Sequence, residues 1–408
     1  GIIRAVYSSS NGLEKRPKLR FPGFDEPWKE TTLSALFSKS TQKNADGHIT
    51  NVICNSAKLG LIPQREYFDK DIANSDNTSG YYIIRQNDFV YNPRKSSDAP
   101  YGPISSYKYA EDGIVSPLYL CFHAKDEINP LYYEWYFRSS AWHRYIYMSG
   151  DSGARHDRVS IKDDTFFAMP INLPSEQEQS KIASFLQSLD ERIAAQEKLV
   201  ASLKKYKRGV MRAIFRDKSF VFSKATVWKS IRLGDECVFF SGGTPKSTDS
   251  SYYGGSIPFI RSGEIHGEKT ELFLTEAGLQ NSSAKMVSKG DLLIALYGAT
   301  SGEVDISKID GAINQAILCI RPYDMSKQYL RYLLEDSKDD IINTYLQGGQ
   351  GNLSAEIIKN LRVDIPDSTA QSSVVEFLSM IERRIEMSVE EYEQIQAMKR
   401  SLLQQLFI

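Results

Sequence analysis

Two segments of the chain carry apolar residues in alternating steps of four and three positions. In residues 175–218 the pattern includes Leu186, Leu189, Ile193, Val200 and Leu203. In residues 366–408 it includes Leu378, Ile381, Ile385, Tyr392 and Ile395. This spacing is the heptad pattern of helices that pack along a common seam. We therefore predict two long helices that pair with each other.

Polar residues interrupt both seams at the same two positions. Gln196 and Ser388 occupy one of them, and Lys207 and Lys399 occupy the other. Two interpretations stay open: these residues are tolerated, with the lysine ends reaching solvent, or they set the register of the helix pair.

Both helices have a signalled beginning. Ser175 and Glu178 form an S-x-x-E capping box for the first helix, and Pro366 with Asp367 offers a similar but weaker start to the second.

The helices belong to a repeat that covers the chain. Residues 171–215 align without a gap on residues 363–407, and Trp28 in the first half recurs as Trp228 in the second. Each half is therefore a globular domain followed by a helix. A duplicated unit tends to pack about a pseudo-twofold axis, which predicts antiparallel helices with one globular head at each end.

The globular heads are expected at residues 19–174 and 219–365. They combine short strands rich in Tyr, Ile and Val with helical stretches at 131–138 and 329–334, and this mixture predicts an α+β fold. Gly, Ser, Asn and Pro cluster at 92–102 and 241–255, which indicates long loops. Residues 1–18 show no clear periodicity, and we interpret them as a leader or a remnant of cloning.

Composition limits the possible partners. The chain has 50 Lys and Arg against 51 Asp and Glu, which argues against a protein that coats nucleic acid indiscriminately, so any DNA contact must be local. No apolar run is long enough to span a bilayer, and we expect a cytoplasmic protein with no membrane partner. The four cysteines never approach a C-x-x-C spacing, which indicates neither a zinc site nor a disulfide framework.

No constellation of catalytic residues stands out. The glycines of residues 242–247 lack the spacing of a phosphate-binding loop. Asn92, Pro93 and Arg94 resemble the beginning of the adenine methyltransferase Asn-Pro-Pro-aromatic motif, but the second Pro and the aromatic residue are missing. The five histidines are scattered without metal-ligand spacing. We therefore predict no catalytic residue, no metal site and no cofactor in this chain.

Candidate DNA contacts lie in the loops, because base edges are read by Arg, Lys, Asn and Gln, and phosphates bind Ser, Thr, Tyr and Lys. In the first head the candidates are Asn92, Arg94, Lys95, Ser105, Ser106, Tyr107, Lys108, Ser152, Arg155, His156 and Arg158. In the second head they are Thr244, Lys246, Arg261, Ser262, Tyr297, Thr300, Ser301, Gln347, Gln350 and Asn352. A basic run at residues 204–216 is either a phosphate contact or a solvated or partner-facing surface.

Four motifs in this order resemble a known family. They are LRFPGF at 19–24, NLPSEQEQ at 172–179, SGGTP at 241–245 and ALYGAT at 295–300. Together with the duplication, they make residues 19–408 similar to the specificity subunits of type I restriction-modification enzymes. The second helix start keeps Pro366 and Gln371 but loses the acids of the first, which is a departure from the symmetry of the repeat.

The resemblance implies a function and a set of partners. Each head reads one half of a bipartite, asymmetric target in double-stranded DNA, and the helices act as a ruler and hold two DNA methyltransferase subunits. A restriction and translocase subunit joins them, and S-adenosylmethionine, ATP and Mg are expected in these partner subunits. Such a subunit is not itself an enzyme.

Two other functions stay open. A coiled-coil scaffold whose heads bind proteins would show no salt-dependent DNA binding. A fragment of a single-chain DNA methyltransferase or nuclease would need a cofactor loop.

Overall fold

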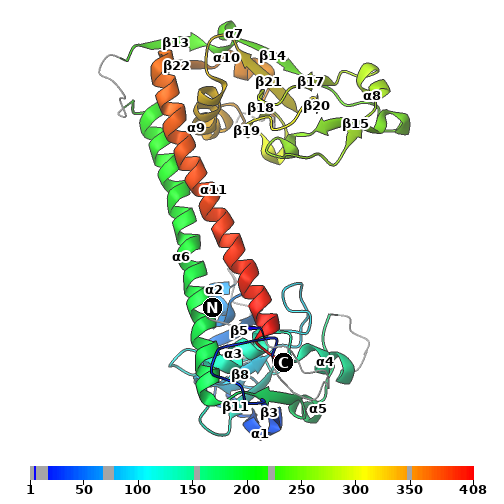
Figure 1. The fold of residues 1–408 in the computed structure, drawn as a ribbon, viewed down its shortest axis with the longest axis vertical. Coiled ribbons are helices and arrows are strands. Elements are labelled where there is room, and N and C mark those ends of the chain that lie inside the picture. Colours follow the sequence, from blue (N-terminus) through cyan, green and yellow to red (C-terminus); the bar gives the residue numbers. More distant parts are fainter. Residues whose placement is uncertain (1–3, 6–16, 68–77, 151–156, 219–225, 347–351) are drawn as a thin grey trace. The chain divides into compact units, whose positions relative to one another are not determined.

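The computed structural model describes residues 4–5, 17–67, 78–150, 157–218, 226–346 and 352–408. These residues form two compact units (Figure 1). The first unit comprises Gly1–Gln196 with Glu391–Ile408, and the second comprises Glu197–Glu390.

The first head contains two four-stranded sheets and a two-stranded ribbon, in the orders β6-β5-β10-β7, β4-β11-β8-β9 and β12-β3. Its strands are β1 Arg4–Ala5, β2 Leu19–Arg20, β3 Lys29–Thr32, β4 Phe37–Ser40, β5 Val52–Ser56, β6 Gly60–Pro63, β7 Tyr82–Ile84, β8 Phe89–Tyr91, β9 Ile104–Ser106, β10 Gly113–Val115, β11 Leu120–Ala124 and β12 Pro170–Leu173. Its helices are α1 Leu33–Leu36, α2 Gln64–Tyr67, α3 Pro130–Arg138, α4 His143–Ser149 and α5 Asp163–Phe167.

The second head has the same arrangement, in the orders β16-β15-β20-β17, β14-β21-β18-β19 and β13-β22. Its strands are β13 Trp228–Arg232, β14 Cys237–Ser241, β15 Tyr253–Ile260, β16 Phe273–Leu274, β17 Lys285–Val287, β18 Leu292–Ala295, β19 Val304–Ile306, β20 Gly311–Ile313, β21 Ile317–Pro322 and β22 Arg362–Pro366. Its helices are α7 Leu233–Glu236, α8 Glu276–Gln280, α9 Lys327–Leu346 and α10 Ala355–Asn360, with short 3₁₀ turns η2 Ser250–Tyr252, η3 Ser262–Glu264 and η4 Gly298–Thr300.

The sheets of the two heads correspond strand by strand. In each head the two central strands of one sheet pair in parallel, β5 with β10 and β15 with β20, whereas the other pairs of the four-stranded sheets are antiparallel. This common topology confirms that the repeat read from the sequence is a structural duplication.

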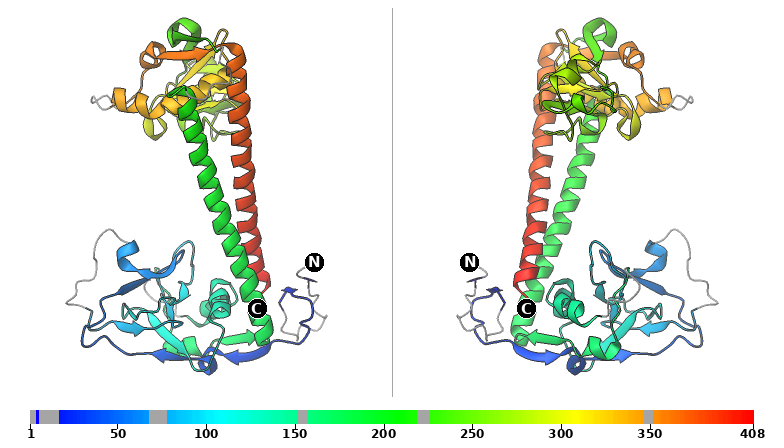
Figure 2. Two further views of the ribbon diagram at one scale, coloured as in Figure 1. Left: turned by 90° about the vertical axis from the view of Figure 1, so that its left-hand side faces the viewer. Right: turned by 90° about the vertical axis from the view of Figure 1, so that its right-hand side faces the viewer.

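The long helices are α6 Glu176–Phe215 and α11 Ser368–Gln405. Their segments lie side by side within each unit (Figure 2). In the first unit, Asp190 contacts Lys399 and Arg192 contacts Glu391, so partner numbers on α11 fall as those on α6 rise. The helices are therefore antiparallel, and the predicted α+β class with two paired helices is confirmed.

The predicted seam positions face protein rather than solvent. Leu186, Leu189, Leu378, Ile381 and Ile395 are buried. The other predicted positions, Ile193, Val200, Leu203, Ile385 and Tyr392, are half-buried. Apolar side chains at heptad spacing are thereby removed from water along the contact between the helices, which stabilises their pairing.

Both helix starts share one side-chain hydrogen bond between residues that the repeat aligns. The side-chain amide of Gln179 donates to the Pro174 carbonyl at 3.1 Å, and Gln371 donates to Pro366 at 2.9 Å. At the start of α11, the Asp367 carboxylate also accepts a hydrogen bond from the Ala370 N–H at 3.0 Å. The Asp367 contact satisfies an N–H group that a helix start leaves without a partner, and the two glutamines tie each helix to the strand end before it.

The predicted capping box of the first helix is only half present. The Ser175 hydroxyl accepts a hydrogen bond from the Glu178 N–H at 3.4 Å. The Glu178 carboxylate, however, binds the Arg20 guanidinium through two bonds of 2.7 and 2.8 Å, and both side chains are buried. Glu178 therefore attaches the N-terminal edge of the head to the helix instead of completing the cap.

Three other expectations need adjustment. The helix expected at 329–334 lies in the first half of the 20-residue α9. The loop expected at 241–255 is shorter, because β14 ends at Ser241 and β15 begins at Tyr253. In the segment interpreted as a leader, Arg4–Ala5 pairs with Leu19–Arg20.

Candidate nucleic-acid interface

A groove of about 880 Å³ opens on the first head, beside the end of β5 and the loop that follows β8. Four of the predicted DNA-contact residues line it together: Asn92, Arg94, Lys95 and Arg158. The last is 63 residues or more from the others in sequence, so only the fold brings this set together. We call this concave surface the first-head groove.

Backbone hydrogen bonds hold the loop that carries the first three residues. The Lys95 N–H donates to the Asp157 carbonyl at 2.8 Å, and the Val159 N–H donates to the Pro93 carbonyl at 2.9 Å. The Asn92 side chain accepts from the Arg94 N–H at 3.1 Å, which is a typical Asx turn. The loop is therefore pinned to the 157–159 segment on one side of the groove.

Gly102 allows the same loop to close. Its φ is +82°, and a Cβ at this position would lie 2.1 Å from the Asn92 carbonyl oxygen. Only glycine fits both the left-handed backbone and this close approach. The close approach of Gly102 to Asn92 thus constrains the loop between β8 and β9, and it fixes the position of Asn92 in the groove.

Two guanidinium groups lie on neighbouring segments of the groove wall. Arg94 and Arg158 form an isolated antiparallel bridge between their backbones. Arg158 Nε is buried without a hydrogen-bond partner among the described atoms. An unsatisfied buried donor is uncommon, and the nearest carboxylate that pairs with this nitrogen is that of Asp157 at 3.9 Å.

The lining of the groove is basic. Lys58, Arg94, Lys95 and Arg158 are its cations, and Asp98 is the acid among the lining residues. Lys58 lies 3.8 Å from Asp98, but both side chains are more than half exposed, so the pair is weak. Such a concave, basic surface suits a polyanion.

The sequence reading missed part of this lining. Ser56, Lys58 and Gln64 come from the β5–β6 hairpin and α2, and Leu118 from the turn before β11. Lys58 lies in a Lys-Leu-Gly turn between two apolar strands, and that turn was the available signal. Asn55 also lines the groove, but it is buried and its amide donates to the Val90 carbonyl at 2.8 Å, so it supports the loop from behind.

Three other candidates of the first head are buried inside it. Ser105 and Ser106 belong to β9, and Tyr107 follows them with a fully buried side chain. Their hydroxyls donate to Asn55, to Glu134 and to the Glu111 carbonyl at 2.7–2.8 Å. These side chains serve the fold, and we do not carry them into the interface.

Lys108 is exposed but paired, because its ammonium lies 2.8 Å from the Glu134 carboxylate. Ser152, Arg155 and His156, and in the second head Gln347 and Gln350, lie outside the described residues.

In the second head, Thr244, Lys246 and Asn352 are exposed. The Thr244 hydroxyl donates to the Gln315 side chain at 2.7 Å. Both glycines before it pack tightly, since a Cβ on Gly242 would lie 1.8 Å from the Ile313 carbonyl oxygen and one on Gly243 would lie 2.6 Å from Ser283 Cβ. The two glycines of the SGGTP segment thus allow a close approach to neighbouring segments, and Thr244 between Gly243 and the buried Pro245 is exposed.

Arg261 is held by acids of its own head. It pairs with Glu264 at 3.0 Å and with Glu271 at 2.5 Å, and these hydrogen bonds raise the pKa of the guanidinium above its usual value. A contact with DNA at this residue would have to compete with both carboxylates.

The remaining candidates of the second head are less accessible. Ser262, Tyr297 and Thr300 are half-buried. Ser301 is buried, and its hydroxyl donates to the Leu296 carbonyl at 3.0 Å, so it supports η4 from within and is not carried into the interface.

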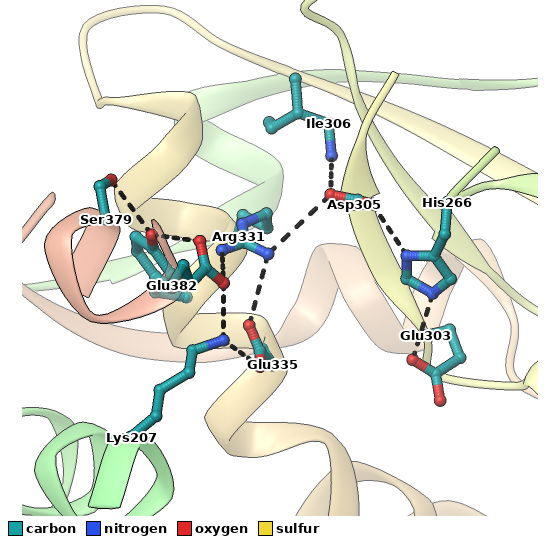
Figure 3. Close-up of polar contacts among 10 residues, drawn as sticks. Lys207, His266, Glu303, Asp305, Ile306, Arg331, Glu335, Ser379 and Glu382 are labelled. Carbon is teal, nitrogen blue, oxygen red and sulfur yellow. Dashed lines mark hydrogen bonds and ion pairs between the residues drawn. The ribbon is translucent and has the colours of Figure 1, made fainter. Parts of the chain in front are cut away.

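An ionic network links α9 of the second head to the helix segments of the same unit (Figure 3). Arg331 pairs with Glu382 of α11 at 2.5 Å and with Glu335 at 3.5 Å. Lys207 of α6 approaches the same two carboxylates at 2.7 and 2.6 Å. The network fixes how α9 packs on this helix pair.

The same network extends to the surface of the second head. Arg331 lies 3.9 Å from Asp305, which pairs with His266 at 2.8 Å. The hydrogen bond to Asp305 raises the pKa of His266, although burial opposes it. Burial acts to raise the pKa of Asp305, but hydrogen bonds from His266 and the Ile306 N–H lower it below its usual value.

Among the described residues, no group of three or more His, Cys, Asp or Glu side chains is placed to hold a metal ion. Within the same residues, no helix is long and apolar enough to cross a membrane. Cys121 and Cys319 are buried and unpaired, and burial raises the pKa of each thiol to about 12.

Comparison with known proteins finds one family in both halves of the chain. The type I restriction modification DNA specificity domain matches residues 31–205 and again residues 226–397. The type I restriction enzyme MjaVIII specificity subunit of Methanocaldococcus jannaschii is 26% identical over 260 residues, covering 58% of this chain and 61% of that protein. The chain spans about 60% of the length of the curated relatives that it matches.

Solved structures share the fold at lower identity. The HsdS subunit from Thermoanaerobacter tengcongensis matches with a TM-score of 0.55 and 17% identity, covering 98% of this chain and 99% of that one. A chain solved in work on complex assembly and conformational transition of the type I R-M system matches with a TM-score of 0.62 and 17% identity, covering 93% and 97%. With its two matching domains spanning most of the sequence, this chain belongs to the type I restriction-modification DNA specificity family.

Proposed function

We propose that this chain recognises the DNA target of a type I restriction-modification complex, with each head reading one half of a bipartite, asymmetric site. The observation that carries the proposal is the first-head groove, where Asn92, Arg94, Lys95 and Arg158 converge on a basic concave surface of a specificity domain. Arg and Asn side chains make the bidentate contacts that distinguish guanine and adenine in the major groove.

The two heads share a topology but differ in the side chains of their loops. The first head offers Arg94 and Arg158, whereas the second offers Thr244, Lys246 and Asn352 at its surface. Different donors and acceptors select different bases, which supports independent reading of the half-sites. The paired helices would act as a ruler and as the docking site for two methyltransferase subunits.

The proposed chain is a recognition subunit without chemistry of its own. A restriction and translocase subunit and the methyltransferase subunits would supply S-adenosylmethionine, ATP and Mg. The assembly would work in the cytoplasm on double-stranded DNA. A scaffold that binds only proteins is disfavoured by the four cations of the first-head groove.

Methylation mapping tests the proposal. The chain is assembled with its methyltransferase subunits, and the methylated sites of a genome are compared for the wild type, Arg94→Ala and Arg158→Ala. We expect relaxed or weakened recognition within one half-site, at a cost of about 1–3 kcal/mol for a lost bidentate contact. Arg85→Ala is the matched control, because Arg85 is an exposed arginine of the same head that does not line the groove.

Two outcomes would contradict the proposal. Unchanged specificity in both groove variants would remove the groove from target reading. Methyl transfer by the purified chain alone would show that it is an enzyme.

A further inference from the structure

Five exposed cations lie on the second half of α6, all within the second unit. We call them the basic stripe, and they are Lys198, Lys204, Lys205, Arg208 and Arg212. No acidic residue occurs between positions 198 and 216. This part of the helix therefore concentrates positive charge in a chain whose net charge is only −1.

The structure separates this basic run into two sets. Lys207 and Arg216 point toward acids: Lys207 pairs with Glu335 and Glu382, and Arg216 pairs with Asp336 and Asp340 at 2.9 Å. The five cations of the basic stripe have no ion pair with any residue that the structure describes. Acidic residues of the same unit thus neutralise Lys207 and Arg216. The five cations of the basic stripe keep their charge without an ion pair among the described residues.

The geometry of a helix places the stripe on one face. Lys198, Lys205 and Arg212 are seven positions apart and return to the same side of α6, and Lys204 and Arg208 form an adjacent row. At about 1.5 Å per residue, the stripe is about 21 Å long. This length matches about six base pairs of B-DNA at about 3.4 Å per step.

The stripe costs the helix stability. Lys204, Arg208 and Arg212 follow each other at four-residue intervals, where like charges repel. Gly209 lies among them on the exposed surface, and a Cβ there would meet no atom within 4 Å. Packing therefore does not require this glycine, although glycine weakens a helix interior. An anionic partner that comes close to the backbone would offset both costs.

The chemistry of the stripe favours phosphates over a protein surface. The cores of protein interfaces are depleted in charged residues such as Lys, although Arg is enriched there. Phosphate backbones, by contrast, are bound mainly by Lys and Arg. The exposed large apolar side chains of this helix segment, Leu199 and Tyr206, lie on the opposite side from Arg208 but only about a quarter to a third of a turn from Lys198 and Lys205.

We propose that the basic stripe binds the phosphate backbone of duplex DNA as a sequence-independent anchor, separate from the base-reading loops. The proposal rests on the proposed function, because it assumes that the chain binds DNA. It adds a contact that raises affinity for every sequence alike.

Salt dependence of DNA binding by the full chain tests the proposal. Binding to a 40-bp duplex of random sequence is measured from about 50 to about 200 mM KCl for the wild type and for R208Q/R212Q. We expect the slope of log K against log salt to fall in magnitude by about 1–2, because each lost phosphate contact removes about 0.9. Glutamine keeps the helix propensity.

R383Q/R384Q is the matched control. Arg383 and Arg384 are exposed on α11 in the same unit, so this variant removes the same charge from another helix face. The slope of the control should equal that of the wild type. A second stripe variant, K198Q/K205Q, should show the same reduction in the salt slope as the first. If one of the two variants folds poorly, the other still tests the proposal.

Several outcomes would overturn the anchor. An unchanged salt slope in both stripe variants would do so. An equal reduction of the slope in the stripe and control variants would also overturn it, because it would reflect net charge alone. An unchanged slope with loss of the co-purifying methyltransferase subunits would show that an acidic protein surface occupies the stripe. If the anchor is overturned but Arg94→Ala still alters target choice, the proposed function stands. If neither the wild type nor any variant binds the duplex, both the anchor and the proposed function are contradicted.

Discussion

Lys207 on α6 and Glu382 on α11 form an ion pair of 2.7 Å that the repeat reproduces as Lys399 with Asp190. Each residue of the first pair lies 192 positions from its counterpart in the second, with the two helices exchanged. The same contact therefore occurs once in each unit. It lies where the apolar seam is interrupted.

An aromatic ring completes both contacts. The Lys207 ammonium lies 5.4 Å from the centre of the Tyr332 ring, and Lys399 lies 4.7 Å from that of Trp135. A cation over such a face is attracted to the ring, more strongly where water is excluded. Both lysines thus have defined partners from a helix and from a head, which favours a role in setting register over simple tolerance.

Replacing Lys207 with Met should destabilise the second unit by about 1.5–3 kcal/mol, because two carboxylates lose a charged hydrogen-bond partner in a largely buried site. Lys204→Met, three residues away on the exposed face, should change stability by less than about 0.5 kcal/mol. Urea unfolding of the full chain measures both. A double-mutant cycle with Glu382→Gln should give a coupling above about 0.5 kcal/mol, and equal losses in the two lysine variants would contradict the pairing.

Gly102→Ala should deform the first-head groove, since the new Cβ would lie 2.1 Å from the Asn92 carbonyl oxygen in a backbone with positive φ. We expect a loss of more than about 1 kcal/mol in stability and weaker recognition of one half-site. Gly80→Ala is the control, because its Cβ would meet nothing within 4 Å. Urea unfolding and methylation mapping provide the readouts. A Gly102→Ala chain with wild-type stability would show that the loop is not constrained in this way.

His266 should make the second unit pH-dependent. Its pKa is raised above 6.5 mainly by the hydrogen bond to Asp305, with a further contribution from Glu303. A raised pKa in the folded state means that protonated His266 stabilises the fold below about pH 6.5, and that this contribution is lost as the pH rises through the folded value. The neighbouring Arg331 and Lys338 pair with these two acids.

The measurement compares urea midpoints of the wild type and His266→Gln at about pH 6 and about pH 8. The wild type should exceed the variant by more at the lower pH. An equal difference at both pH values would mean that His266 does not titrate against its acids.

The sequence by itself determined the architecture of this protein. The heptad steps predicted α6 and α11, because helix periodicity is a local pattern in the sequence. The gapless repeat predicted two equivalent heads, because a duplication is visible when the sequence is aligned with itself. The repeated Pro174 and Gln179 match Pro366 and Gln371, and the structure shows the same hydrogen bond between these residues at both helix starts. Loop composition selected Arg94 as a candidate DNA contact, and the structure shows its side chain exposed, although composition could not tell what lies beside it.

Only the tertiary structure decided which polar residues face solvent and which partners they have. Glu178 looked like half of a capping box, yet it binds Arg20, which is 158 positions away. The sequence predicted both Tyr107 and Arg158 as DNA contacts in loops, but Tyr107 is buried and Arg158 lines the first-head groove. The physical reason is that burial and ion pairing depend on which distant segments pack together, and periodicity along the chain carries no information about those contacts.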